Sequence, residues 1–168
     1  VLLSIISDIL DFSKIEAGKL ELENIPFDIK EMLDKLHALL RYQADSKGVR
    51  LKFTIDKNLP DTICGDAVRL RQIILNFLSN AIKFTDKGGS VSLHALEIRR
   101  AGEISLIEVS VKDSGIGIKE EDISKIFEKF TQADSSTTRK FGGTGLGLPI
   151  SKLLIEKMDG EIEVKSEP

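Results

Sequence analysis

Residues 75–85 read LNFLSNAIKFT and form the second half of a long segment whose apolar residues repeat with helical spacing. A Gly-Asp pair at 65–66 precedes the segment and the pattern stops near Phe84, so we predict one long helix between them. The residues that share its apolar face are Leu70, Ile74, Phe77, Leu78 and Ala81. A helix with such a face needs another layer to pack against.

Three polar residues share a different face of the same helix. At about 100° per residue, Asn76, Asn80 and Lys83 lie within about 60° of one another. Asparagine is a mediocre helix former, so two of them one turn apart favour a role beyond solvation. An Asn side-chain oxygen can bind a hard cation such as Mg²⁺, with phosphates and water completing the coordination. An ordinary solvated helix face is the alternative interpretation.

A second polar segment, VSVKDSGIGIKEED, follows a predicted strand. Val109 and Val111 show the alternation of a strand, and Asp113 follows at the next alternate position. This pattern places a carboxylate at the strand end. Such a carboxylate could accept hydrogen bonds from the exocyclic amine of a base, and Gly115 and Gly117 would let the backbone approach a flat ligand. A simple surface turn is the alternative.

The segment FGGTGLGLPISK at 141–152 places four glycines before a predicted helix. It fits neither the P-loop pattern nor the Rossmann pattern. Unpaired amides at the start of a helix can still bind phosphate, and Arg139 and Lys140 could reach phosphate oxygens from the preceding loop. That loop, residues 131–142, lacks periodicity and is predicted to be mobile. A flexible linker is the alternative.

The other segments mix helical and strand patterns without regular β-α-β order. We predict helices at 1–18, 28–45 (ended by Gly48), 120–130 and 145–158 (capped by Gly160), with Pro149 in the first turn of the last. We predict strands at 19–29, 49–55, 62–64, 90–98, 104–113 and 161–167, with a hairpin around 99–102. This mixture favours an α+β sandwich with helices on one face of a mixed sheet.

The composition limits the class of protein. A chain of 168 residues with 41% hydrophobic residues suits one globular domain, and a net charge of −3 argues against a general nucleic-acid binder. The single cysteine, Cys64, rules out a disulfide framework. No apolar run approaches the roughly 20 residues that span a bilayer, so membrane contact is not expected. The chain starts inside an apolar helical pattern and stops inside a strand-like pattern. These two interrupted patterns predict that both ends continue in a longer protein.

Four motifs resemble, in order, the N, G1, F and G2 boxes of sensor histidine kinases. They are LNFLSNAIKFT, DSGIGI, KIFEKF and GGTGLGL. Residues 2–23 resemble the second helix of the dimerisation hairpin that precedes the catalytic domain in that family. The resemblance implies a Bergerat-type two-layer sandwich, shared with gyrase-type ATPases. It implies a remnant of the hairpin helix at 1–18 and an ATP-binding catalytic domain at 19–168 whose C-terminal edge is truncated.

The resemblance also implies a site for ATP and Mg²⁺. Asn80 would be the metal ligand, Asn76 would line the same site, and Lys83 would approach the phosphates. Asp113 would accept the adenine amine. The other residues implied to contact the nucleotide or to anchor and form a lid over it are Phe84, Gly115, Gly117, Phe127, Phe130, Arg139, Lys140, Gly143, Thr144, Gly145, Leu146 and Gly147.

The activity implied by the resemblance is that of a protein histidine kinase in two-component signal transduction. In relatives that hydrolyse ATP, a glutamate one turn before the metal-binding Asn activates water. Asn76 cannot act as a general base, so it favours phosphoryl transfer over hydrolysis. The rival hypotheses are a hydrolysing ATPase, a non-catalytic pseudokinase and a plain dimerisation module.

The phosphoacceptor histidine of the family would lie upstream of residue 1. The two histidines present, His37 and His94, lie outside such a motif and are interpreted as structural or surface residues. This chain alone is therefore not expected to autophosphorylate. The implied partners are its own dimerisation domain in a homodimer and a receiver domain or response regulator, with DILDFSKIEAG favouring the hybrid type. The implied location is cytoplasmic, and membrane anchoring of the parent protein stays open.

Overall fold

The structure is a computed structural model that describes residues 2–128 and 145–167. The chain falls into two compact units. The central unit is Glu23–Ile116, and the terminal unit combines Val1–Leu22 with Gly117–Pro168. The predicted domain boundary after residue 18 stays a prediction.

A mixed three-stranded sheet in the order β2-β4-β5 forms one layer of the central unit. Its strands are β2 (Arg50–Ile55), β4 (Ser90–Ala101) and β5 (Ile104–Asp113). Strand β2 pairs parallel with β4, whereas β4 and β5 form an antiparallel hairpin. The hairpin and the mixed sheet confirm the sequence prediction. A separate antiparallel pair joins β1 (Ile25–Asp28) to β3 (Thr62–Gly65).

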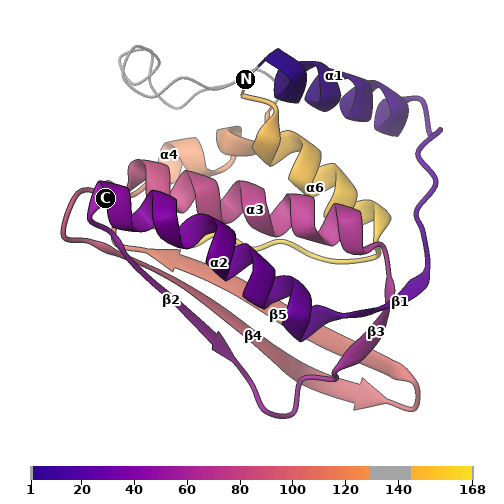
Figure 1. Cartoon of the computed structure of the whole chain (residues 1–168). Coiled ribbons are helices and arrows are strands. Elements are labelled where there is room, and N and C mark those ends of the chain that lie inside the picture. The colour runs from indigo at the N-terminus through magenta and orange to yellow at the C-terminus, as the bar shows by residue number, and fades with distance from the viewer. Residues whose placement is uncertain (1, 129–144, 168) are drawn as a thin grey trace. The chain divides into compact units, whose positions relative to one another are not determined.

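Helices α2 (Ile29–Lys47) and α3 (Ala67–Phe84) lie on one face of this sheet (Figure 1). Helix α2 begins where the Asp28 carboxylate accepts the amide of Glu31 at 2.8 Å. It ends at Gly48, whose φ of 71° lies in the left-handed region that glycine adopts most easily. Both ends were predicted from the sequence.

Helix α3 begins at a buried carboxylate. Asp66 accepts the Arg69 amide at 3.0 Å through Oδ1 and the Glu23 amide at 3.2 Å through Oδ2. The cap thus holds the first turn of α3 and also ties down the segment that leads into β1. The predicted helix start is confirmed.

The core of the central unit lies between the two helices and the sheet. Leu33 and Leu36 of α2, Leu78 of α3 and Leu93 of β4 are at most 1% exposed. Full burial of a side chain of this kind contributes roughly 1.5–3 kcal/mol. Most of the predicted apolar face of α3 is buried, namely Ile74, Leu78 and Ala81, and Leu70 and Phe77 are half-buried. This arrangement confirms the α+β sandwich.

The terminal unit is helical. Its elements within the described residues are α1 (Leu2–Glu16), α4 (Glu120–Ile123), the short 3₁₀ helix η1 (Lys125–Phe127) and α6 (Gly147–Lys157). Helix α1 contacts α6, and Pro149 lies in the first turn of α6 as predicted. Among the helices that the structure describes, none has the length and apolar character needed to span a bilayer.

Several predicted boundaries were wrong. Residues 161–167 form no strand, although Ile162 and Val164 alternate with exposed neighbours. Residues 19–24 also form no strand, and pairing begins only at Ile25. Alternation alone does not make a strand, because backbone groups need a partner strand to complete a ladder.

Two helix ends also differ from prediction. The segment 120–130 forms two very short helices, α4 and η1, where one was predicted; its last two residues lie outside the described part. Helix α6 spans Gly147–Lys157 where 145–158 was predicted, and the positive φ of 57° falls on Asp159, directly before the predicted cap Gly160. Asp can adopt this conformation, and Gly160 still donates its amide to the Ile155 carbonyl at 2.9 Å.

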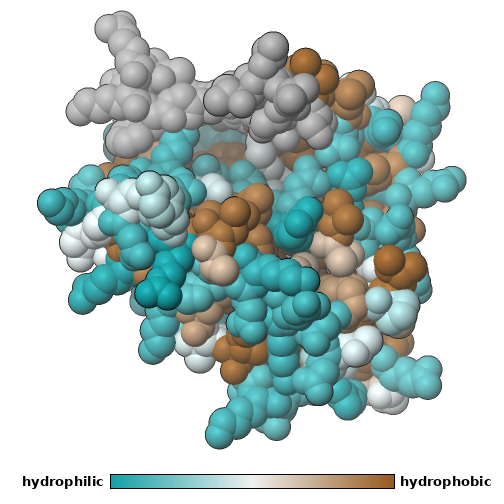
Figure 2. Space-filling view, in the orientation of Figure 1, coloured by the Kyte–Doolittle hydropathy of each residue, from teal (hydrophilic) through white to brown (hydrophobic). Residues whose placement is uncertain are grey.

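The surface is mixed in polarity. On the face shown in Figure 2, hydrophilic residues surround small groups of hydrophobic ones. The exposed apolar side chains of α2 include Leu39 and Tyr42, which are 63% and 82% exposed. Scattered apolar residues of this kind are normal on soluble domains and mark no site by themselves.

Candidate functional site

The polar face of α3 is formed as the sequence predicted. Asn76 and Asn80 are half-buried, and Nδ2 of Asn80 donates to Oδ1 of Asn76 over 3.3 Å. In this orientation, the amide oxygen of Asn80 is the atom available as a hard ligand. The bond therefore fixes the Asn80 amide group relative to Asn76.

Lys83 lies one turn further along α3. It is half-buried, and burial lowers the pKa of its ammonium group from the usual lysine value. Its Nζ lies 4.8 Å from the centroid of the Phe84 ring, a distance suited to a cation–π contact. The ammonium group is thus held near the C-terminal end of the helix.

A turn from the end of β5 packs against this end of α3. Strand β5 ends at Asp113, and the Gly115 amide donates to Oδ1 of Asp113 at 2.8 Å. The next amide, that of Ile116, donates to the Phe84 carbonyl at 3.3 Å. A Cβ at Gly115 would lie 2.6 Å from this carbonyl oxygen, so only glycine fits without displacement. The turn and the helix are therefore in direct contact.

The structure brings six predicted site residues together within the central unit. We call them the helix-end cluster: Asn76, Asn80, Lys83, Phe84, Asp113 and Gly115. The cluster offers two amides, one ammonium group and one exposed carboxylate that is oriented by a backbone amide. A carboxylate fixed in this way can accept a further hydrogen bond, and the amide and ammonium groups suit a metal-bound polyphosphate.

The donor set fits a magnesium ion only if the ligand supplies most of the oxygens. In the part of the chain that the structure describes, no group of three or more His, Cys, Asp and Glu side chains could hold a metal. A cation at the helix-end cluster would instead use the Asn80 amide oxygen together with phosphate oxygens and water.

Other predicted residues belong to the terminal unit. Gly117 and Gly145 both have φ of 69°, and Gly147 is the first residue of α6, directly after the buried Leu146. Phe127 is half-buried, and Nζ of Lys152 lies 5.6 Å from its ring centroid. The remaining predicted residues, Phe130, Arg139, Lys140, Gly143 and Thr144, lie outside the described residues. The roles assigned to all of these residues stay predictions.

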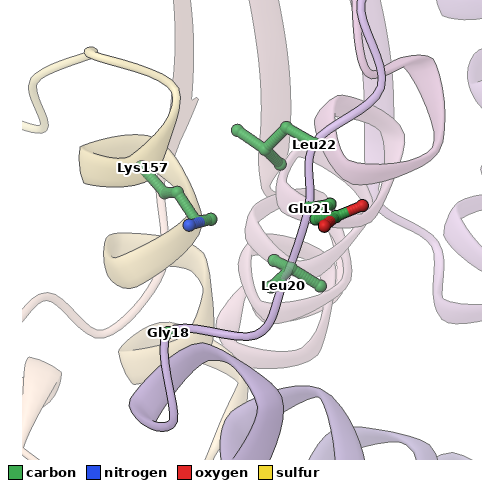
Figure 3. Close-up of a pocket in the computed structure, with 5 residues that line it drawn as sticks. All are labelled: Gly18, Leu20, Glu21, Leu22 and Lys157. Atoms are coloured by element: carbon green, nitrogen blue, oxygen red, sulfur yellow. The ribbon is translucent and has the colours of Figure 1, made fainter.

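A surface depression in the terminal unit is a different feature (Figure 3). Lys157 of α6 faces four residues that follow α1, namely Gly18, Leu20, Glu21 and Leu22. The depression is shallow and contains no residue of the predicted site. We therefore place the candidate site at the helix-end cluster.

The two histidines lie in structural or surface positions, as the sequence predicted. The His37 ring packs on Phe53 with 4.8 Å between ring centroids, and His94 is exposed on β4. Neither lies in the helix-end cluster.

Two supporting residues were missed by the sequence analysis. Thr85 is fully buried, and its hydroxyl donates to the Ala81 carbonyl at 2.7 Å. Lys47 donates to carbonyls at the end of α3 from the last residue of α2. A Thr directly after a helix is a weak sequence signal. A Lys at the end of a helix is also a weak signal, because the partners of Lys47 are distant in sequence.

Comparison with known proteins places these observations in context. Residues 65–168 match the family model described as histidine kinase-, DNA gyrase B-, and HSP90-like ATPase. The chain is 48% identical over 168 residues to the signal transduction histidine-protein kinase BarA of Escherichia coli strain K12. That match covers 99% of this chain and 18% of BarA, so the chain spans less than a fifth of this relative.

Two solved structures are similar throughout most of the chain. Full-length ShkA in complex with AMPPNP superposes with a TM-score of 0.79 at 37% identity, over 94% of this chain and 31% of ShkA. Histidine kinase ThkA in complex with the response regulator protein TrrA gives a TM-score of 0.69 at 26% identity, over 95% of this chain and 41% of the matched chain.

Proposed function

Because the chain belongs to the family of histidine kinase-, DNA gyrase B- and HSP90-like ATPases, we propose that it is the ATP-binding catalytic domain of a sensor histidine kinase. In the full protein it transfers the γ-phosphoryl group of ATP to a histidine of the dimerisation domain. The relationship to BarA and the AMPPNP complex of ShkA support this proposal. The observation that carries it is the contact between the Asp113 turn and the polar end of α3.

The Asp113 carboxylate is the adenine-recognition group in this proposal. One of its oxygens is fixed by the Gly115 amide, and its other oxygen would accept the hydrogen bond from the adenine amine. The close approach of Gly115 to the Phe84 carbonyl leaves no room for a side chain between the turn and the helix. Phe84 then provides an apolar surface near the base.

Asn80 and Lys83 act at the phosphate end. The Asn80 amide oxygen would hold Mg²⁺, which supplies charge neutralisation at the phosphates. Lys83 contributes a second positive charge. An imidazole nitrogen of the acceptor histidine forms the new P–N bond while the bond from the γ-phosphorus to the bridging oxygen breaks and ADP leaves. The acceptor needs no base at position 76, because imidazole carries its own lone pair.

The proposed partners follow from the reaction. The acceptor histidine belongs to the dimerisation domain of the same protein, which acts as a homodimer. The phosphoryl group then passes to a receiver domain on the same chain or on a separate response regulator, a proposal supported by the complex of ThkA with TrrA. The domain works in the cytoplasm, whether or not the parent protein is membrane-anchored.

Calorimetric titration of this chain with AMPPNP, with and without Mg²⁺, tests the nucleotide proposal. We expect binding that is tighter with Mg²⁺, and Asn80→Ala should remove that difference. Absence of binding at millimolar AMPPNP would disprove the proposal.

The role of Asp113 is tested by Asp113→Asn. Loss of a hydrogen bond to a charged group corresponds to about 1.5–3 kcal/mol, so the affinity for AMPPNP should fall roughly ten- to hundredfold. Asp34→Asn is the matched control, because Asp34 is exposed on α2 and the charge change is identical. Equal affinities of the two variants would remove Asp113 from the site.

A transfer assay separates the kinase from its rivals. The chain is mixed with ATP and a dimerisation hairpin that carries the acceptor histidine. We expect acid-labile label on the hairpin and none on this chain alone. Release of free phosphate without labelled hairpin would support the ATPase alternative, and nucleotide binding without either product would support a pseudokinase.

A further inference from the structure

Lys47 supports the end of α3 from another helix. It is the last residue of α2 and is half-buried, and its Nζ donates to the carbonyl oxygens of Ile82, at 2.9 Å, and of Lys83. These carbonyls belong to the last turn of α3, where the intrahelical pattern leaves oxygens without amide partners. A cation at this position also interacts favourably with the helix dipole.

Each of the last four carbonyls of α3 has an identified donor. The Ala81 carbonyl accepts from the amide and hydroxyl of Thr85, and the Phe84 carbonyl accepts from the Ile116 amide. Lys47 donates to the two between them, those of Ile82 and Lys83. The last turn of α3 is therefore held by side chains and by the Asp113 turn. This turn carries Lys83 and Phe84, and Asn80 lies directly before it.

We propose that Lys47 is a positioning residue for the nucleotide site, acting through the backbone of α3 and not through contact with ATP. This inference rests on the proposed nucleotide-binding function. Without the ammonium group, the Ile82 and Lys83 carbonyls lose this donor, and the last turn frays. Asn80 and Lys83 then lose their fixed position at the helix end, and the Phe84 carbonyl no longer anchors the Asp113 turn.

A role in stability alone makes a different prediction from a positioning role. General destabilisation raises amide exchange throughout the central unit. Loss of positioning raises exchange mainly at the amides that close the helix end, those of Thr85 and Ile116. The amides of the β4–β5 hairpin report the global effect, because their ladder lies outside the contact made by Lys47.

The experiment compares Lys47→Met with Lys87→Met in the 168-residue chain. Methionine keeps an unbranched apolar stem and removes the donors. Lys87 is an exposed lysine in the loop after α3, so its variant makes the same change in charge near the same helix end. Hydrogen exchange is measured without nucleotide, and affinity for Mg²⁺–AMPPNP is measured by calorimetry.

For Lys47→Met we expect exchange at Thr85 and Ile116 to rise at least tenfold more than exchange in the hairpin. Affinity for Mg²⁺–AMPPNP should fall about tenfold, whereas Lys87→Met stays within twofold of the wild type. Lys47→Arg, which restores donors, should recover most of the affinity. If Lys47→Met does not fold, Lys47→Ala gives the same comparison, because alanine carries no side-chain donor and favours the helix.

The outcomes that contradict the inference are distinct. A uniform rise in exchange, or unchanged exchange at Thr85 and Ile116, would show that Lys47 does not position the helix end. Tight binding by both the wild type and Lys47→Met would overturn the inference and leave the proposed function intact. Failure of the wild type itself to bind nucleotide would overturn both.

Discussion

Gly115→Ala places a methyl group where the structure has no space. Its Cβ would lie 2.6 Å from the Phe84 carbonyl oxygen and 2.7 Å from Oδ1 of Asp113. Ordinary contacts of this kind begin at 3.4 Å, so one of these groups must move by about 0.8 Å. The Phe84 oxygen is held by the Ile116 amide, and the Asp113 oxygen by the Gly115 amide itself. The strain cannot be relieved by rotating one flexible side chain.

Overpacking of this kind destabilises a protein by about 1–3 kcal/mol. With a urea slope of about 2 kcal/mol per molar, the midpoint of unfolding should fall by roughly 0.5–1.5 M. The displaced Asp113 carboxylate should also weaken AMPPNP binding about tenfold or more. Urea unfolding followed by circular dichroism measures the first effect, and calorimetry on the folded variant measures the second.

Gly65→Ala is the matched control for this variant. Its Cβ would meet only the Phe27 ring, at an ordinary 3.7 Å, and its φ lies outside the left-handed region. It should change neither the unfolding midpoint nor the affinity by a comparable amount. If Gly115→Ala behaved like Gly65→Ala in both assays, the steric argument for the turn would be refuted.

Three further predictions concern α3. Leu78→Ala removes a fully buried side chain and should lower the free energy of unfolding by about 2–5 kcal/mol in urea titrations. Asp66→Ala removes the acceptor of the Arg69 and Glu23 amides. It should lower the free energy of unfolding by roughly 0.5–2 kcal/mol, measured in the same titrations. Burial lowers the pKa of Lys83, so the unfolded chain binds more protons than the folded chain between the two pKa values. Stability should therefore rise with pH in that alkaline window, and Lys83→Met should remove the rise in unfolding free energies measured across it.

Much of the central unit was predictable because its signals are local. The Asp28 and Asp66 caps, the Gly48 stop and the polar face at Asn76 and Asn80 all depend on residues within a few positions of one another. Helical periodicity and capping chemistry act over this range, so one sequence suffices to read them.

The errors occurred where the outcome depends on distant partners. Alternation at Ile162 and Val164 predicted a strand, but a strand exists only where another strand completes its ladder. The hydrogen bonds from Lys47 to α3 could not be predicted from the sequence either, because the acceptor residues lie 35 and 36 positions away.

The parallel pairing of β2 with β4 has a consequence for the order of folding. The β4–β5 hairpin closes between neighbouring residues, whereas β2 meets β4 only after the chain has passed through β3 and α3. Closing the longer loop carries the larger entropy loss, so the hairpin should form early and β2 should join late. Asp113 belongs to the early hairpin and Asn80 to the intervening helix. Nucleotide should therefore slow unfolding without accelerating formation of the hairpin, because the two halves of its site meet only after α3 has packed against the hairpin.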